Sequence, residues 1–68
     1  MFESVGTFAE SLKKKYGSAL LNKANTAKEL SISRATLDRM RQQGEIKSQK
    51  IRKQIRFNVK EIARVVMS

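Results

Sequence analysis

Apolar side chains recur along this chain at two spacings, and each spacing predicts a different kind of element. Over the first quarter of the chain they lie three and four positions apart, which places them on one face of an α-helix. These residues are Val5, Phe8, Ala9, Leu12 and Tyr16. Gly17 can end a helix in the left-handed conformation, so we expect an amphipathic helix within residues 1–18. Its start is open between Ser4 as N-cap and a capping box of Thr7 with Glu10.

A short segment and a second helix follow. Residues 19–21 are too few for a helix and fit a small edge strand. The next helix ends near Leu30 and begins either at Asn22 or at a capping box of Thr26 with Glu29.

A third helix is predicted almost at once, because Ser33 is a suitable N-cap and Gly44 can end the helix. This helix covers residues 34–43, and its side chains Leu37 and Met40 face inward. At about 100° per residue, the opposite side carries Ala35, Asp38, Arg39 and Gln42. Two short helices joined by a tight turn are therefore expected.

After Gly44 the apolar spacing changes from helical to alternating. Apolar and polar residues alternate strictly over residues 54–57, which predicts a half-buried strand. We expect a two-stranded hairpin over residues 46–57 with its tip near Arg52 and Lys53. The tip has neither Gly nor Asn, so a loop longer than two residues is expected.

The last segment returns to the helical spacing. Asn58 with Glu61 resembles a capping box, which marks the start of a helix. The apolar residues that follow are spaced as one buried stripe, and they are Val59, Ile62, Ala63 and Val66.

Composition limits the kinds of chemistry that this chain can perform. Its 68 residues suffice for one small domain, and they include neither Cys nor His. The usual zinc ligands and the commonest general base are thus missing, and Glu29 and Glu61 have simpler roles at helix starts. We expect no enzymatic activity and no cofactor. No apolar run could span a membrane and no signal peptide is visible, so a cytoplasmic protein is expected.

The charge is both large and unevenly placed. Fifteen Lys and Arg against six Asp and Glu give a net charge of +9, which favours a polyanionic partner. Eight of the fifteen basic residues lie between Arg34 and Arg56, where only Asp38 and Glu45 oppose them. A surface charged only for solubility would mix the two signs.

From Leu20 to Val66 the chain resembles the small winged helix-turn-helix domains of the MerR-like excisionase superfamily. The resemblance rests on Leu20-Leu21-Asn22 with Ala27-Lys28-Glu29-Leu30, on Ser31 to Met40, on Gly44-Glu45-Ile46, and on Lys50 to Phe57. It implies a mainly α fold with a small β-hairpin wing, preceded here by an extra N-terminal helix. We assign the winged helix-turn-helix domain to residues 19–68. Members of the family often have Gly where this chain has Ser31, in the turn between the two helices.

The resemblance also implies double-stranded DNA as the partner, with helix 34–43 in the major groove. Arg34 and Arg39 are candidates for guanine, Ala35 for a thymine methyl group, and Thr36 for a base or a phosphate. Asp38 lies one helical turn after Arg34 and is expected to hold its guanidinium group. The candidates for backbone and wing contacts are Lys23, Lys28, Gln42, Lys50, Arg52, Lys53 and Arg56.

The family's roles leave two possibilities open. One is an excisionase that directs recombination together with an integrase, and the other is a small transcription regulator of a phage, plasmid or other mobile element. The N-terminal helix, with Phe2, Val5, Phe8 and Leu12, either associates with a second copy or completes the core. A basic interaction module or RNA-binding adaptor is the alternative, although RNA readers commonly stack bases on exposed aromatic side chains.

Overall fold

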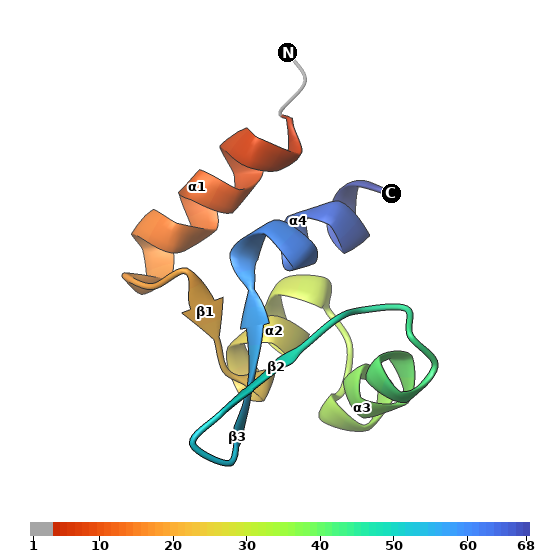
Figure 1. Cartoon of the computed structure of the whole chain (residues 1–68). Coiled ribbons are helices and arrows are strands. Elements are labelled where there is room, and N and C mark those ends of the chain that lie inside the picture. Colours follow the sequence, from red (N-terminus) through yellow and green to blue (C-terminus); the bar gives the residue numbers. More distant parts are fainter. Residues whose placement is uncertain (1–3) are drawn as a thin grey trace.

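Four helices and a small antiparallel sheet make up residues 4–68, the part of the chain that this computed structural model describes (Figure 1). The elements in order are α1 Val5–Tyr16, β1 Leu20–Leu21, α2 Lys23–Leu30, α3 Arg34–Gln42, β2 Gln49–Ile51, β3 Gln54–Asn58 and α4 Val59–Met67. The mainly α fold with a β-hairpin wing is confirmed, and α1 precedes it.

Side-chain caps define where the first two helices start. The Ser4 hydroxyl accepts a hydrogen bond from the backbone N–H of Thr7 at 3.0 Å, so the earlier of the two possible starts of α1 is used. Gly17 ends α1 with a φ of 70°. The Asn22 side chain accepts from the backbone N–H of Asn25 at 2.8 Å, which places the start of α2 at the earlier position as well.

The turn between α2 and α3 holds a serine in the left-handed conformation. Ser31 has φ 58° and ψ 41°, a region that costs a non-glycine residue on the order of 1 kcal/mol. Two residues later the Ser33 hydroxyl accepts from the N–H of Thr36 at 3.1 Å and caps α3. The helix ends at Gln42, one residue before the predicted end, and Gly44 follows with a φ of 78°.

The sheet joins the start of the helix-turn-helix to the wing. Its strand order is β1-β3-β2, and both pairings are antiparallel, so β1 is an edge strand as expected. Leu21 pairs with Phe57 between β1 and β3, and Gln49 pairs with Arg56 between β2 and β3. The paired strands cover residues 49–58, so the hairpin begins three residues after and ends one residue after the predicted bounds of 46–57. We call residues 46–57 the wing.

The prediction of a loop longer than two residues at the tip of the wing is wrong. Ile51 pairs with Gln54, which leaves only Arg52 and Lys53 to form the turn. Their φ angles are 51° and 69°, so both are left-handed, as in a type I′ turn. The twist of this turn matches the right-handed twist of the paired strands, and this match outweighs the missing Gly or Asn.

Helix α1 packs against α4 and completes the core (Figure 1). Ala9 and Leu12 are each 2% exposed, and Phe8 packs partly buried against the same core. Most of the apolar face of α1 is therefore already used within the chain, although Val5 stays exposed. Phe2 was also considered for self-association, and it lies outside the described residues. The core consists of Ala9, Leu12, Leu21, Ala27, Leu37, Ile46, Phe57, Val59, Ile62 and Ala63.

One member of the predicted stripe in α4 is not buried. Val59, Ile62 and Ala63 lie in the core, whereas Val66 is 43% exposed. Val66 follows the other three at helical spacing and lies in the last turn of α4. Val65 packs partly against the core in its place.

The two glutamates predicted at helix starts make other contacts. Asn58 caps α4 by accepting from the N–H of Lys60 at 2.8 Å, but Glu61 does not complete the capping box. Its carboxylate instead accepts from the N–H of Lys47 at 2.9 Å and pairs with Arg64 at 2.6 Å. The contact with the Lys47 N–H joins α4 to the segment that precedes β2.

Glu29 bridges the N-terminal helix and the helix-turn-helix. Its carboxylate accepts from the Lys15 ammonium group at 2.9 Å and from the Tyr16 hydroxyl. Both donors belong to the last turn of α1. The capping box of Thr26 with Glu29 is thus not formed, because α2 has already begun at Asn22.

Candidate nucleic-acid interface

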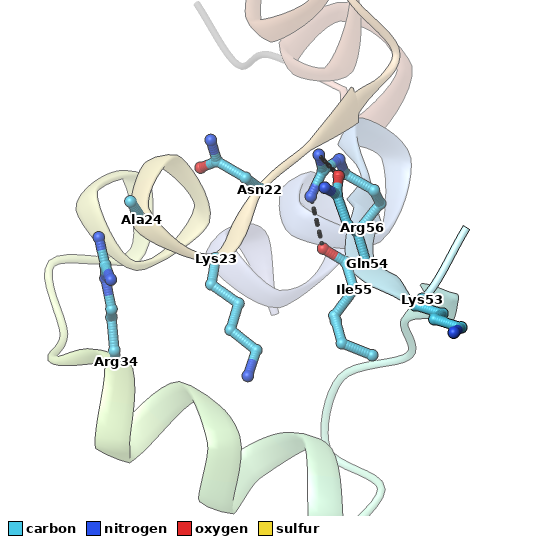
Figure 2. A pocket seen from close by; sticks show the side chains of 8 residues that line it. All are labelled: Asn22, Lys23, Ala24, Arg34, Lys53, Gln54, Ile55 and Arg56. Carbon is cyan, nitrogen blue, oxygen red and sulfur yellow. Dashed lines mark hydrogen bonds between the residues drawn. The ribbon is translucent and has the colours of Figure 1, made fainter. Parts of the chain in front are cut away.

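A cleft lies between the start of α2, the start of α3 and strand β3 (Figure 2). It has a volume of about 430 Å³, and we call it the cationic cleft. The cleft exists because the tight turn at Ser31 brings the start of α3 close to α2, while β3 is held beside β1. Its lining residues are Asn22, Lys23, Ala24, Arg34, Lys53, Gln54, Ile55 and Arg56.

Lys23 crosses the cationic cleft from α2 toward α3. Figure 2 shows its side chain extending toward the α3 ribbon, and its ammonium group lies 2.8 Å from Oδ1 of Asp38. Arg34 points the other way, from the start of α3 toward Ala24 in α2 (Figure 2). The two cations therefore lie on opposite sides of the gap between the two helices.

Asp38 does not hold Arg34, and this prediction is wrong. Its Oδ1 pairs with Lys23 and also lies 3.4 Å from Nη2 of Arg41. The hydrogen bond from Lys23, with a smaller effect of Arg41, holds the pKa of the Asp38 carboxyl below its usual range. Spacing along α3 suggested Arg34, but the fold supplies a closer cation from α2.

The predicted base-reading residues all belong to the first two turns of α3. Arg34, Ala35 and Arg39 are exposed, and Thr36 is half-buried. The Thr36 hydroxyl is bonded to the Ser33 hydroxyl at 3.0 Å, and Nη2 of Arg39 lies 3.5 Å from the same Thr36 oxygen. A contact of 3.5 Å is at the limit for a hydrogen bond, so most donors of the Arg39 guanidinium group remain available.

The basic residues of the wing differ in how freely they can reach a partner. Lys50, Arg52 and Lys53 are exposed, and Lys53 lines the cationic cleft. Arg56 is half-buried, and its guanidinium group donates to the Ile55 carbonyl at 3.1 Å and to the Gln54 side chain (Figure 2). Arg56 therefore keeps only some of its five donors for a ligand.

The fold brings four of the predicted residues together in the cationic cleft, namely Lys23, Arg34, Lys53 and Arg56. The other predicted residues stand outside its lining, on α2, α3 and the wing. These are Lys28, Ala35, Thr36, Arg39, Gln42, Lys50 and Arg52.

Sequence reasoning missed two neutral polar residues of the cationic cleft. Asn22 was recognised only as a helix cap, and Gln54 only as one position of an alternating strand. No local signal marks either as a site residue, because the cleft forms only when α2 and β3 come together. The strict alternation at Gln54 to Phe57 was the one available hint that this side chain faces away from the core.

Two further findings concern the described part of the chain, residues 4–68. Within it, no group of three or more His, Cys, Asp or Glu could hold a metal ion. None of its helices combines the length and the apolar character needed to cross a membrane.

Comparison with known proteins gives one match. A family model described as a helix-turn-helix domain matches residues 20–68, which is most of the chain. The searches of curated proteins and of solved structures found no match.

Proposed function

The chain belongs to the helix-turn-helix domain family, an excisionase-like family of DNA-binding domains, and on that premise we propose a sequence-specific function on double-stranded DNA. We infer that it serves a phage, plasmid or other mobile element as an excisionase or as a small transcription regulator. The observation that carries the proposal is the position of α3, whose outer side is exposed while Leu37 anchors its inner side with no exposed surface. A helix held in this way can enter a major groove.

Helix α3 is the proposed recognition helix. Arg34 and Arg39 contact guanine O6 and N7, and each has guanidinium donors available for two hydrogen bonds. Ala35 is exposed and small enough to contact a thymine methyl group. Thr36 contacts a base or a phosphate, provided that its hydroxyl gives up its bond to Ser33.

The wing is proposed to lie on the adjacent minor groove or backbone. Arg52 and Lys53 form its tip, where both are exposed. Lys50 and Arg56 lie on its two strands. Contacts of this kind set the position and orientation of the protein and contribute little sequence information.

The remaining candidates complete the contact with the DNA backbone. Lys23 and Lys28 come from α2, and Gln42 lies at the end of α3. Lys23 reaches the cationic cleft even while it is paired with Asp38, and its ammonium group has two further donors. Lys28 is exposed outside the cleft and would contact a more distant phosphate.

One helix-turn-helix reads only a few base pairs, so specific action requires several copies or a partner. An excisionase would bind closely spaced direct repeats, bend the DNA and recruit an integrase. A regulator would bind an inverted repeat as a dimer. Because most of the apolar face of α1 packs against the core, we expect any contact between copies to form elsewhere on the surface.

The test is selection of bound fragments from a random pool of duplex DNA, followed by a gel shift of the selected site, random duplex and single-stranded RNA. We expect a recovered sequence motif and preference for the selected duplex. Equal or tighter binding to RNA would favour the RNA-binding adaptor instead. The aromatic residues Phe57, Phe8 and Tyr16 pack in or against the core, which supports the choice of DNA.

A further inference from the structure

Asp38 is the single acidic residue between Glu29 and Glu45, and it lies in the helix proposed to enter the major groove. A carboxylate there is repelled by phosphates, so its position requires an explanation. The structure shows how the charge is accommodated. Lys23 from α2 and Arg41 from α3 both contact the carboxylate, at 2.8 Å and 3.4 Å.

Both cations contact the same oxygen atom of Asp38. Lys23 and Arg41 each pair with Oδ1, whereas Oδ2 has no hydrogen-bond partner among residues 4–68. The side chain is 36% exposed, so solvent or a ligand can reach it. The carboxylate is thus held through Oδ1, and Oδ2 remains available to accept a hydrogen bond from a base.

We propose that Asp38 is a specificity-determining residue that reads the exocyclic amino group of a base in the major groove. This inference rests on the proposed function and adds a contact to it. An ionised carboxylate only accepts hydrogen bonds. Cytosine N4 and adenine N6 offer a donor at the major-groove edge, while guanine O6 and thymine O4 are acceptors. On the strand that Oδ2 of Asp38 faces, the carboxylate therefore selects cytosine or adenine and disfavours guanine and thymine.

Lys23 is the positioning residue for this contact. Its ammonium group approaches Asp38 from α2, across the cationic cleft, and orients the carboxylate from outside the recognition helix. It also offsets the repulsion between the carboxylate and nearby phosphates. The contact of Lys23 with Asp38 thus links the position of α2 to the base preference of α3.

The experiment is DNA selection with the wild-type protein and with Asp38→Ala and Asp38→Asn. The wild type should enrich one base pair at the position that Asp38 contacts. Asp38→Ala should reduce that preference by about fivefold to tenfold and leave the base preference at the other positions unchanged. The expected loss is at the low end of the discrimination that side-chain contacts to bases provide, because Asp38 makes a single hydrogen bond. Asp38→Asn, which keeps the shape of the side chain, should shift the position toward adenine, because an amide pairs with adenine N6 and N7.

Glu45→Gln is the matched control. Glu45 is exposed just after α3 and appears in none of the ion pairs of residues 4–68, so the change removes an equal charge nearby. It should raise affinity for all duplexes alike and leave the base preference unchanged. Lys23→Met should weaken the preference at the same position as Asp38→Ala, whereas Lys28→Met should not. Thermal unfolding followed by circular dichroism verifies that each variant is folded.

The outcomes separate this inference from the function on which it rests. If the wild type yields no enriched duplex motif, the proposed function fails. If a motif is found and folded Asp38→Asn and Asp38→Ala both retain it unchanged, Asp38 reads no base and only this inference is overturned.

Discussion

The hydroxyl of Tyr16 at the end of α1 donates a hydrogen bond to the carboxylate of Glu29 in α2. The two residues are 13 positions apart, and Lys15 donates to the same oxygen of Glu29. This contact fixes the N-terminal helix to the helix-turn-helix at the end of α1 opposite to Ser4. Together with the packing of α1 on α4, it makes the N-terminal helix part of the folded domain.

The first prediction concerns this contact. Tyr16→Phe removes the hydroxyl while leaving the ring in place, and it should lower the free energy of unfolding by about 1 kcal/mol. Denaturant unfolding measures the loss, and Lys14→Ala is the control because Lys14 is exposed on the same helix. DNA affinity should not change, since Tyr16 does not line the cationic cleft. A variant as stable as the wild type would show that Tyr16 does not secure α1.

The second prediction concerns acid unfolding. The hydrogen bond from Arg64, with a smaller effect of the Lys47 N–H, lowers the pKa of Glu61 to about 2 from an ordinary value of 4.5. Because the pKa is lower in the folded protein, the stability from Glu61 is complete above pH 4.5 and is lost as the pH falls toward 2. Glu61→Gln should therefore flatten the dependence of unfolding free energy on pH within this range. An unchanged slope would contradict the contact.

The third prediction concerns the tip of the wing. Lys53 has a φ of 69°. This left-handed conformation costs a residue with a Cβ atom about 1 kcal/mol, and glycine avoids that cost. Lys53→Gly should raise the free energy of unfolding and at the same time weaken binding to all duplexes, because one phosphate contact is lost. Thermal unfolding and a gel shift measure the two effects. Lys53→Ala is the control, since it removes the charge but retains the strain.

How far the sequence predicts this structure depends on whether the cause is local. Ser33 and Gly44 mark the ends of α3 by their own hydrogen bonding and backbone freedom, and both act as expected. The Leu37 anchor follows from helical spacing. These features involve residues close together in the chain, so a pattern within one segment predicts them.

Two of the missed features join segments that are distant in the chain. The Lys23–Asp38 pair spans α2 and α3, and the contact of Glu61 with the Lys47 N–H spans α4 and the segment before β2. The exposure of Val66 depends on where the core ends, which its spacing in α4 cannot show. The turn at Arg52 and Lys53 is imposed by the pairing of two strands.

The fourth prediction concerns the electrostatic part of binding. If about six phosphates are neutralised, the logarithm of the affinity should fall with the logarithm of the salt concentration at a slope near −5. Titrations of a random duplex at several salt concentrations measure this slope. Lys28→Met should reduce it by about one unit, as expected for the loss of one phosphate contact. A slope near zero would remove electrostatic attraction as the source of affinity.

The most direct test of the central claim compares Arg39→Ala with the wild type on the selected site and on random duplex. Arg39 is exposed on the outer side of α3 and has donors available for a guanine. The variant should lose roughly 1 to 3 kcal/mol of binding free energy on the selected site and much less on random duplex. Equal losses on the two duplexes would contradict base reading by α3.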